Sequence, residues 1–148
     1  MRHVSLALRL MLLLSVPFAA LAAAAVSLPS VSLHADAPDG AKGQAFMGGA
    51  DMVSWGQVTL LVGPAKDSDP KTVDDAAAPH GADGSSAIKK EALADGRVLT
   101  YTGKPDAKSP YAVMARRTIG GKDFLAATNV QTPEQQAEAV AVVRSLRP

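Results

Sequence analysis

The fold is decided by the stretch YAVMARRTIGGKDFLAATN, residues 111–129. A glycine pair, Gly120-Gly121, divides it into two runs of similar length, and glycine accepts the positive φ angles of a tight hairpin turn. Alternation along both runs predicts strands with one face on a core and the other in water. The core-facing side chains are predicted to be Tyr111, Val113, Ala115, Phe124, Ala126 and Thr128.

A helix is expected directly after this hairpin. Thr132 suits the N-cap, Pro133 suits the first helical position, and Gln135 stands three residues after the cap, which completes a capping box. Apolar residues then recur at helical spacing and predict one buried stripe. That stripe consists of Ala139, Val142, Val143 and Leu146.

Upstream segments add strands and one short helix. Hairpins are predicted at residues 44–55 and 87–102, a buried strand at 58–62, and a helix from Pro70 to Ala78, capped by Ser68 or Asp69. The predicted fold is α+β: an antiparallel sheet of five to seven strands, a short middle helix, and a C-terminal helix packed on one face.

This layout resembles the PsbP-like family of small α/β/α sandwich domains. The likeness lies in the strand at Val58–Val62, the helix after Pro70, the hairpins and the closing helix that begins at Thr132. It covers residues 44–147 and is one of pattern. The resemblance implies binding and accessory roles rather than catalysis, and no functional residue carries over by position.

The N-terminus has the three-part pattern of a secretory signal. A basic start with Arg2 and Arg9 precedes an uncharged stretch at 10–26, and alanines follow the Leu-rich part. Cleavage is expected after Ala22, with Ala24 and Ala25 as alternatives. The other possibility is an uncleaved membrane anchor, although 17 residues are few for a span.

The expected organisation is a signal peptide at 1–22, a flexible lead-in at 23–43 and a single α+β domain at 44–148. Loss of Arg2 and Arg9 leaves 13 basic residues against 14 acidic ones, a net charge of −1, which gives no electrostatic footprint for nucleic acid. The chain has no cysteine. We expect a periplasmic or secreted bacterial protein that touches a membrane only through an uncleaved signal.

The single catalytic candidate is His80. It stands in a polar segment with Ser85 and Ser86, and Asp74 or Asp75 could orient it, as a small hydrolase requires. No G-x-S-x-G elbow accompanies these residues. A solvated histidine in a polar loop is the alternative interpretation.

Motifs for metals and phosphates are missing from the sequence. Asp67-Ser68-Asp69 begins like a calcium loop, but Thr72 stands where the loop needs glycine and Ala78 where it needs glutamate. No cofactor is therefore expected. The remaining ligand candidates are aromatic, because Trp55 could form a platform with Tyr101 or Tyr111.

Three functions remain open at this point. The first is an exported, non-catalytic domain that binds a protein or small ligand, for example an inhibitor or immunity-type protein. The second is a small hydrolase that uses His80 with a nearby Ser or Asp. The third is a structural protein of the cell envelope. An exposed apolar patch would favour the first, and clustering of His80 with acids in a pocket would favour the second.

Overall fold

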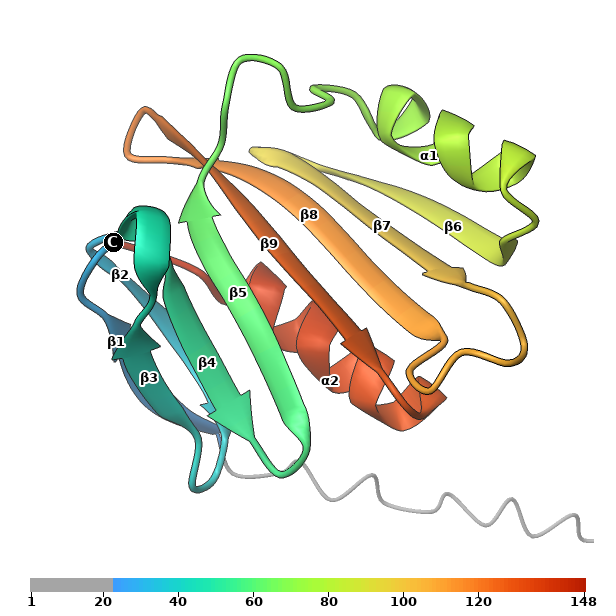
Figure 1. Ribbon diagram of the computed structural model, residues 1–148. Coiled ribbons are helices and arrows are strands. Elements are labelled where there is room, and N and C mark those ends of the chain that lie inside the picture. Colours follow the sequence, from blue (N-terminus) through green and yellow to red (C-terminus); the bar gives the residue numbers. More distant parts are fainter. Residues whose placement is uncertain (1–22) are drawn as a thin grey trace, which may run out of the picture.

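The computed structural model describes residues 23–148, and the predicted signal peptide with its cleavage after Ala22 lies outside them. Nine strands form two antiparallel sheets (Figure 1). The smaller sheet pairs β1 with β2, and the larger has the order β3-β4-β5-β9-β8-β7-β6. The strands are β1 (Ala23–Leu28), β2 (Leu33–Pro38), β3 (Lys42–Ala45), β4 (Asp51–Trp55), β5 (Val58–Pro64), β6 (Ser86–Leu93), β7 (Gly96–Thr102), β8 (Tyr111–Ile119) and β9 (Lys122–Val130).

Two α-helices complete the fold, α1 (Val73–Ala82) and α2 (Pro133–Arg144), with a short 3-10 turn, η1 (Met47–Gly49). This arrangement confirms the predicted α+β class. None of the helices among residues 23–148 is long and apolar enough to cross a membrane.

The two faces of the large sheet are covered differently. On one face, here called the inner face, α2 and the β1–β2 hairpin close the main core. On the opposite, outer face, α1 packs mainly on β6 and β7, where Ala76 and Ala77 contact Leu99. Figure 1 shows α2 behind the sheet and α1 beside β6 and β7 at one end. Within residues 23–148, the outer face over β4, β5 and β9 has no α-helix on it, whereas on β8 Met114 packs against the α1 cluster and Arg116 binds the Asp69 carbonyl.

Helix α2 follows its sequence signals closely. The Thr132 hydroxyl accepts from the Gln135 backbone at 3.2 Å, and the Gln135 side chain accepts from the Thr132 backbone at 3.2 Å. Ala139, Val142, Val143 and Leu146 are all buried. The predicted stripe is thus the surface that packs against the sheet.

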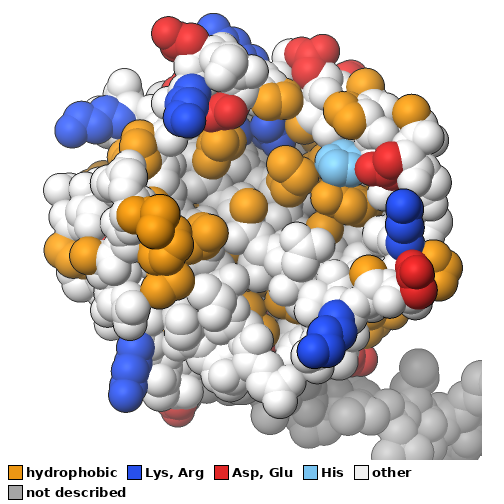
Figure 2. Space-filling model, in the orientation of Figure 1, with side chains coloured by type: hydrophobic (Ala, Val, Ile, Leu, Met, Phe, Trp, Pro, Cys, Tyr) orange, Lys and Arg blue, Asp and Glu red, His pale blue; other side chains and the backbone are white. Residues whose placement is uncertain are grey.

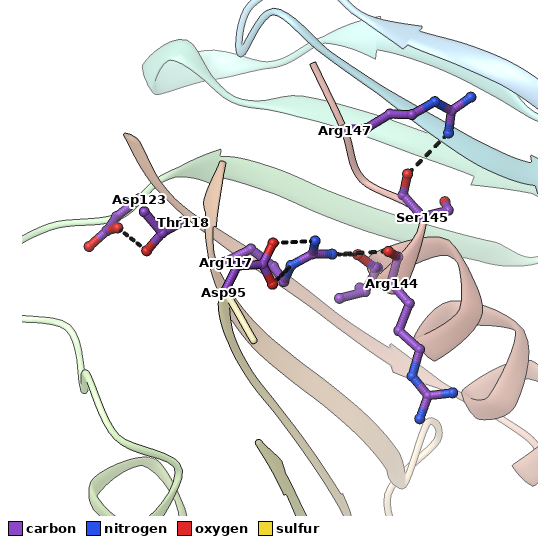
Figure 3. A network of polar contacts seen from close by, with 8 residues as sticks. Asp95, Arg117, Thr118, Asp123, Arg144, Ser145 and Arg147 are labelled. Atoms are coloured by element: carbon purple, nitrogen blue, oxygen red, sulfur yellow. Dashed lines mark hydrogen bonds and ion pairs between the residues drawn. The ribbon is translucent and has the colours of Figure 1, made fainter. Parts of the chain in front are cut away.

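Arg117 on β8 fastens the other end of α2 (Figure 3). Its Nε and Nη2 donate to the two carboxylate oxygens of Asp95 at 2.7 and 2.6 Å, while Nη1 donates to the carbonyl oxygens of Val143 and Arg144 at 2.8 and 3.1 Å. A cation at the carboxyl end of a helix also complements the helix dipole. One side chain therefore joins β8, the β6–β7 turn and α2.

The flexible lead-in predicted at residues 23–43 is instead ordered structure. Residues 23–38 form the β1–β2 hairpin, and β2 buries Leu33, Ala35 and Ala37 on the main core. The buried Asp51 accepts the backbone N–H of Val31 at 3.0 Å and so holds the hairpin turn. Alanine buries little apolar area per residue, which made this alternation a weak signal in the sequence.

The middle helix also differs from the prediction. It begins at Val73, where the Thr72 hydroxyl accepts from the Asp75 backbone at 3.1 Å, and runs through Pro79 to Ala82. The cap is Thr72 and neither Ser68 nor Asp69, the two predicted caps. Asp69 instead accepts from the Lys66 backbone at 2.6 Å, and the Pro70 carbonyl accepts from Arg97 at 2.6 Å. These contacts hold residues 66–70 as a loop on the sheet, so the helix starts later.

Candidate functional site

The structure places His80 near the end of α1, on the outer face. Its ring stacks on Tyr101, with ring centroids 3.9 Å apart and an interplanar angle of 22°. Its Nδ1 lies 3.3 Å from Oδ2 of Asp83. The acids expected to orient it are engaged elsewhere, because Asp74 pairs with Lys90 at 2.7 Å and Asp75 accepts from Thr72 at 2.6 Å.

Asp83 lies between Ser85 and His80 and binds both side chains. The Ser85 hydroxyl donates to Oδ1 of Asp83 at 2.6 Å and the Ser85 backbone donates at 2.9 Å. These bonds, together with the weaker effect of His80, lower the pKa of the Asp83 carboxyl. In a serine hydrolase the hydroxyl donates to the histidine that removes its proton. The Ser85 hydroxyl and the His80 ring instead bind the two oxygens of one carboxylate. The direct contact between the two residues joins backbones, because the Ser85 N–H donates to the His80 carbonyl oxygen at 3.2 Å.

The three aromatic candidates do not form one platform. Trp55 is buried on the inner face, where its Nε1 donates to Glu138 at 2.9 Å. Tyr111 packs against the same inner core. Tyr101 lies on the outer face beneath His80, and burial raises the pKa of its hydroxyl. The sheet itself therefore separates Tyr101 from the other two.

A different surface collects the exposed hydrophobic side chains. Among residues 23–148 the large hydrophobic residues that remain exposed are Phe46 (39% exposed), Met47 (77%) and Leu61 (38%). Phe46 and Leu61 line a depression of about 400 Å³ together with Met52 and Ala127. Figure 2 shows this side of the molecule hollowed, with hydrophobic side chains in the hollow and on both sides of it. We call the outer face over β4, β5 and β9 the open face.

The β3–β4 turn holds Phe46 and Met47 at the edge of the open face. Gly48 and Gly49 have φ angles of 72° and 76°, which side-chain-bearing residues rarely adopt. The Phe46 backbone donates to the carbonyl of Ala50 at 2.8 Å and closes the turn. Two large apolar side chains are thus held outward at a position where turns usually carry polar ones.

A second cluster on the outer face is structural. Arg97 and Arg116 lie opposite each other on β7 and β8 and are almost fully buried. Arg116 donates to Asp123 at 2.6 Å and to the Asp69 carbonyl at 3.1 Å, while Arg97 binds the Pro70 carbonyl. Burial, and then the charge of Arg116, lower the pKa of Arg97. The pair anchors the segment before α1 to the sheet.

Within residues 23–148 no three His, Asp or Glu side chains gather as metal ligands would. Asp69, Asp74 and Asp75 act in a turn, an ion pair and a helix cap. Asp69 closes its turn on Lys66, and Asp75 bonds to the cap residue Thr72.

The open face was missed by sequence reasoning because its residues come from distant segments. Leu61 on β5 pairs with Ala127 on β9, and Met52 on β4 pairs with Leu61. The one local signal was the pair Phe46-Met47 beside two glycines. Comparison with known proteins finds no matching family model, no matching curated protein and no matching solved structure.

Proposed function

We propose that this chain is an exported, non-catalytic domain that binds a partner on the open face. The observation that carries the proposal is the depression lined by the exposed Phe46 and Leu61, with the exposed Met47 next to Phe46 in the same turn, because exposed apolar patches mark interaction sites. Methionine and aromatic side chains are also enriched at protein interfaces. The partner is therefore expected to present an apolar surface.

The export part of the proposal rests on the sequence alone. A basic start, the leucines at 10–14 and the alanines at 19–25 are the supporting features. The pattern-level resemblance to the PsbP-like family, whose members have binding and accessory roles, points the same way. A periplasmic or secreted location follows as part of the same proposal.

Site-specific crosslinking tests where the partner binds. Met47 is replaced by the photoreactive residue benzoyl-phenylalanine in cells that make the protein, and the exposed Lys104 is replaced in a control. We expect one discrete adduct from position 47 and none from position 104. The adduct yield from position 47 should fall at least fivefold when Phe46→Ser and Leu61→Ser are added. Equal adducts from both positions, or none from position 47, would contradict the proposal.

The variant His80→Ala distinguishes a hydrolase from a binding domain. A binding domain should keep its adduct yield in this variant, because His80 lies on α1 and outside the depression. If the purified protein hydrolyses chromogenic esters or peptides, and His80→Ala removes that activity at an unchanged melting temperature, the hydrolase becomes the better explanation. Lys71→Ala, at an exposed position just before α1, controls for the loss of a polar side chain near the same helix.

A further inference from the structure

We propose that a pocket next to the buried Arg97–Arg116 pair binds the phosphate group of a phosphomonoester. The pocket measures about 470 Å³ and lies between the segment before α1, the β6–β7 turn and the adjoining ends of β8 and β9. Its polar lining consists of Lys71, Asp95, Arg116, Thr118 and Asp123. It shares no lining residue with the depression on the open face, so this inference is independent of the proposed function.

Arg97 is the main reason to expect an anion here. The side chain is only 4% exposed, yet its Nε and Nη1 have no hydrogen-bond partner within residues 23–148. Gly96 before it in the chain and Arg116 opposite it on β8 both line the pocket. Its Nη2 donates to the carbonyl of Pro70, next to Lys71 of the lining. Because a buried cation without a counter-charge is costly, an anion bound beside Arg97 is favourable.

The two acids that line the pocket are already engaged with other groups. Both oxygens of Asp95 accept from Arg117, at 2.7 and 2.6 Å. The oxygens of Asp123 accept from Thr118 and Arg116, each at 2.6 Å. Figure 3 shows Asp95 facing Arg117 and Asp123 facing Thr118. An incoming anion therefore meets carboxylates whose charge is compensated.

Two cations at the pocket have no carboxylate of their own. Within residues 23–148, neither Lys71 nor Arg97 forms an ion pair. Asp69 and Asp75 attract Arg97 through space, but burial and the charge of Arg116 have larger effects and lower the pKa of Arg97. A phosphomonoester carries a charge of about −1.5 to −2 at pH 7, which matches two unpaired cations.

The residues that would contact the phosphate are Lys71, which is exposed, and Arg116, which lines the pocket. Lysine and arginine are the usual phosphate ligands among side chains. Arg97 lies behind the pocket wall and acts through its charge, which is weakly screened because its Nε and Nη1 are shielded from water. The pocket volume is within the range of small-molecule sites, so the organic part of the ligand also has room.

Two probes test the site and distinguish a soluble ligand from a lipid headgroup. Glycerol phosphate is titrated into the exported, purified protein and followed by NMR, with sodium chloride at equal ionic strength as the control. Vesicles of phosphatidylcholine with phosphatidic acid are tested by co-sedimentation. Glycerol phosphate should shift the backbone signals of Gly96 and Thr118 if the ligand is soluble. Binding to the vesicles alone would identify the ligand as a lipid headgroup.

Matched lysine variants locate the binding. Lys71→Gln should weaken binding of the active probe about fivefold, as expected for a partly exposed charge contact. Lys66→Gln, at an exposed position of the same segment and outside the pocket, should leave the affinity unchanged. Ligands that bind the folded state stabilise it. Glycerol phosphate, if it binds, should therefore raise the melting temperature of the wild type and not that of Arg97→Met.

Several results would overturn the proposal. One is the absence of any response at Gly96 and Thr118 together with no binding to the vesicles. Another is an equal response to sodium chloride. Equal weakening by Lys71→Gln and Lys66→Gln would indicate general attraction to positive charge, and would overturn it as well.

Discussion

Arg117, a largely buried side chain on the interior strand β8, joins that strand to the β6–β7 turn and to the end of α2. Replacing it by methionine removes a bidentate ion pair with Asp95 and two bonds to the end of α2. We expect Arg117→Met to lower the free energy of unfolding by about 2–3 kcal/mol, as charged hydrogen bonds do. Urea denaturation measures the change.

A second arginine provides the control for that experiment. Arg144 pairs with Glu91 at 2.5 Å, but both side chains are about half exposed. Exposed pairs contribute about 0–1 kcal/mol, so Arg144→Met should change stability far less. Equal losses from the two variants would show that Arg117 does not fasten α2 as described.

Asp95 should make the stability depend on pH. The hydrogen bonds from Arg117 hold the pKa of its carboxyl below the ordinary value of 3.8. A lowered folded-state pKa stabilises the fold above the ordinary value, and the contribution is lost as pH falls through the folded-state pKa. Asp95→Asn should therefore be less stable than wild type at pH 7, and the difference should shrink below about pH 4.

Urea denaturation at pH 7, 5, 4 and 3 follows this difference. Asp106→Asn, in the exposed loop between β7 and β8, is the matched control and should track wild type throughout. A gap between wild type and Asp95→Asn that stays constant down to pH 3 would rule out the linkage.

Among the elements, α2 gives the clearest test of packing. Val143 is fully buried in the main core, so Val143→Asp places an unpaired charge there. We expect a loss of about 3 kcal/mol or more in the free energy of unfolding. Ala141→Asp, an exposed position of the same helix, should cost less than about 1 kcal/mol. A thermal melt unchanged by Val143→Asp would refute the packing.

The same element shows what the sequence could predict. The capping box at Thr132 and the stripe at Ala139–Leu146 are local patterns, and the structure confirms both. The start of α1 and the β1–β2 hairpin depend instead on distant partners. The Arg97 side chain donates to the Pro70 carbonyl and holds the segment before α1 in place. Leu33 is buried because α2 and β4 lie beside β2. Neither contact leaves a periodic signal in the chain.

The open face could not be predicted from the sequence, because it too is formed by segments that are distant along the chain. Phe46, Leu61 and Ala127 become neighbours only when β3–β4 and β5–β9 pair in their observed registers. The residues that the sequence did single out, Trp55, Tyr101 and Tyr111, were chosen for chemical type, and strand alternation places them on opposite faces.

For the whole molecule, the position of β1 indicates where the signal peptide is expected to be cut, because β1 begins at Ala23. Ala23 pairs with Pro38 and Ala24 with Ala37, so a cut after Ala22 leaves all these pairs intact. We predict that exported protein begins at Ala23, and intact-mass measurement checks it. A start at Ala25 or Val26 would mean that β1 is shorter in the mature chain. Met1 on a membrane-bound product would contradict cleavage altogether.

Residues 145–147, after α2, bind strand β2 near the start of the described chain. Arg147 exchanges backbone hydrogen bonds with His34 at 2.8 and 3.0 Å, and Ser145 binds the Asp36 backbone across 109 positions of sequence. A polypeptide that emerges N-terminus first makes its first hairpin long before the residues that cover it. The core around this hairpin can therefore close only after residues 145–147 have been made. A prematurely terminated product would leave the leucines of that hairpin uncovered and open to proteases.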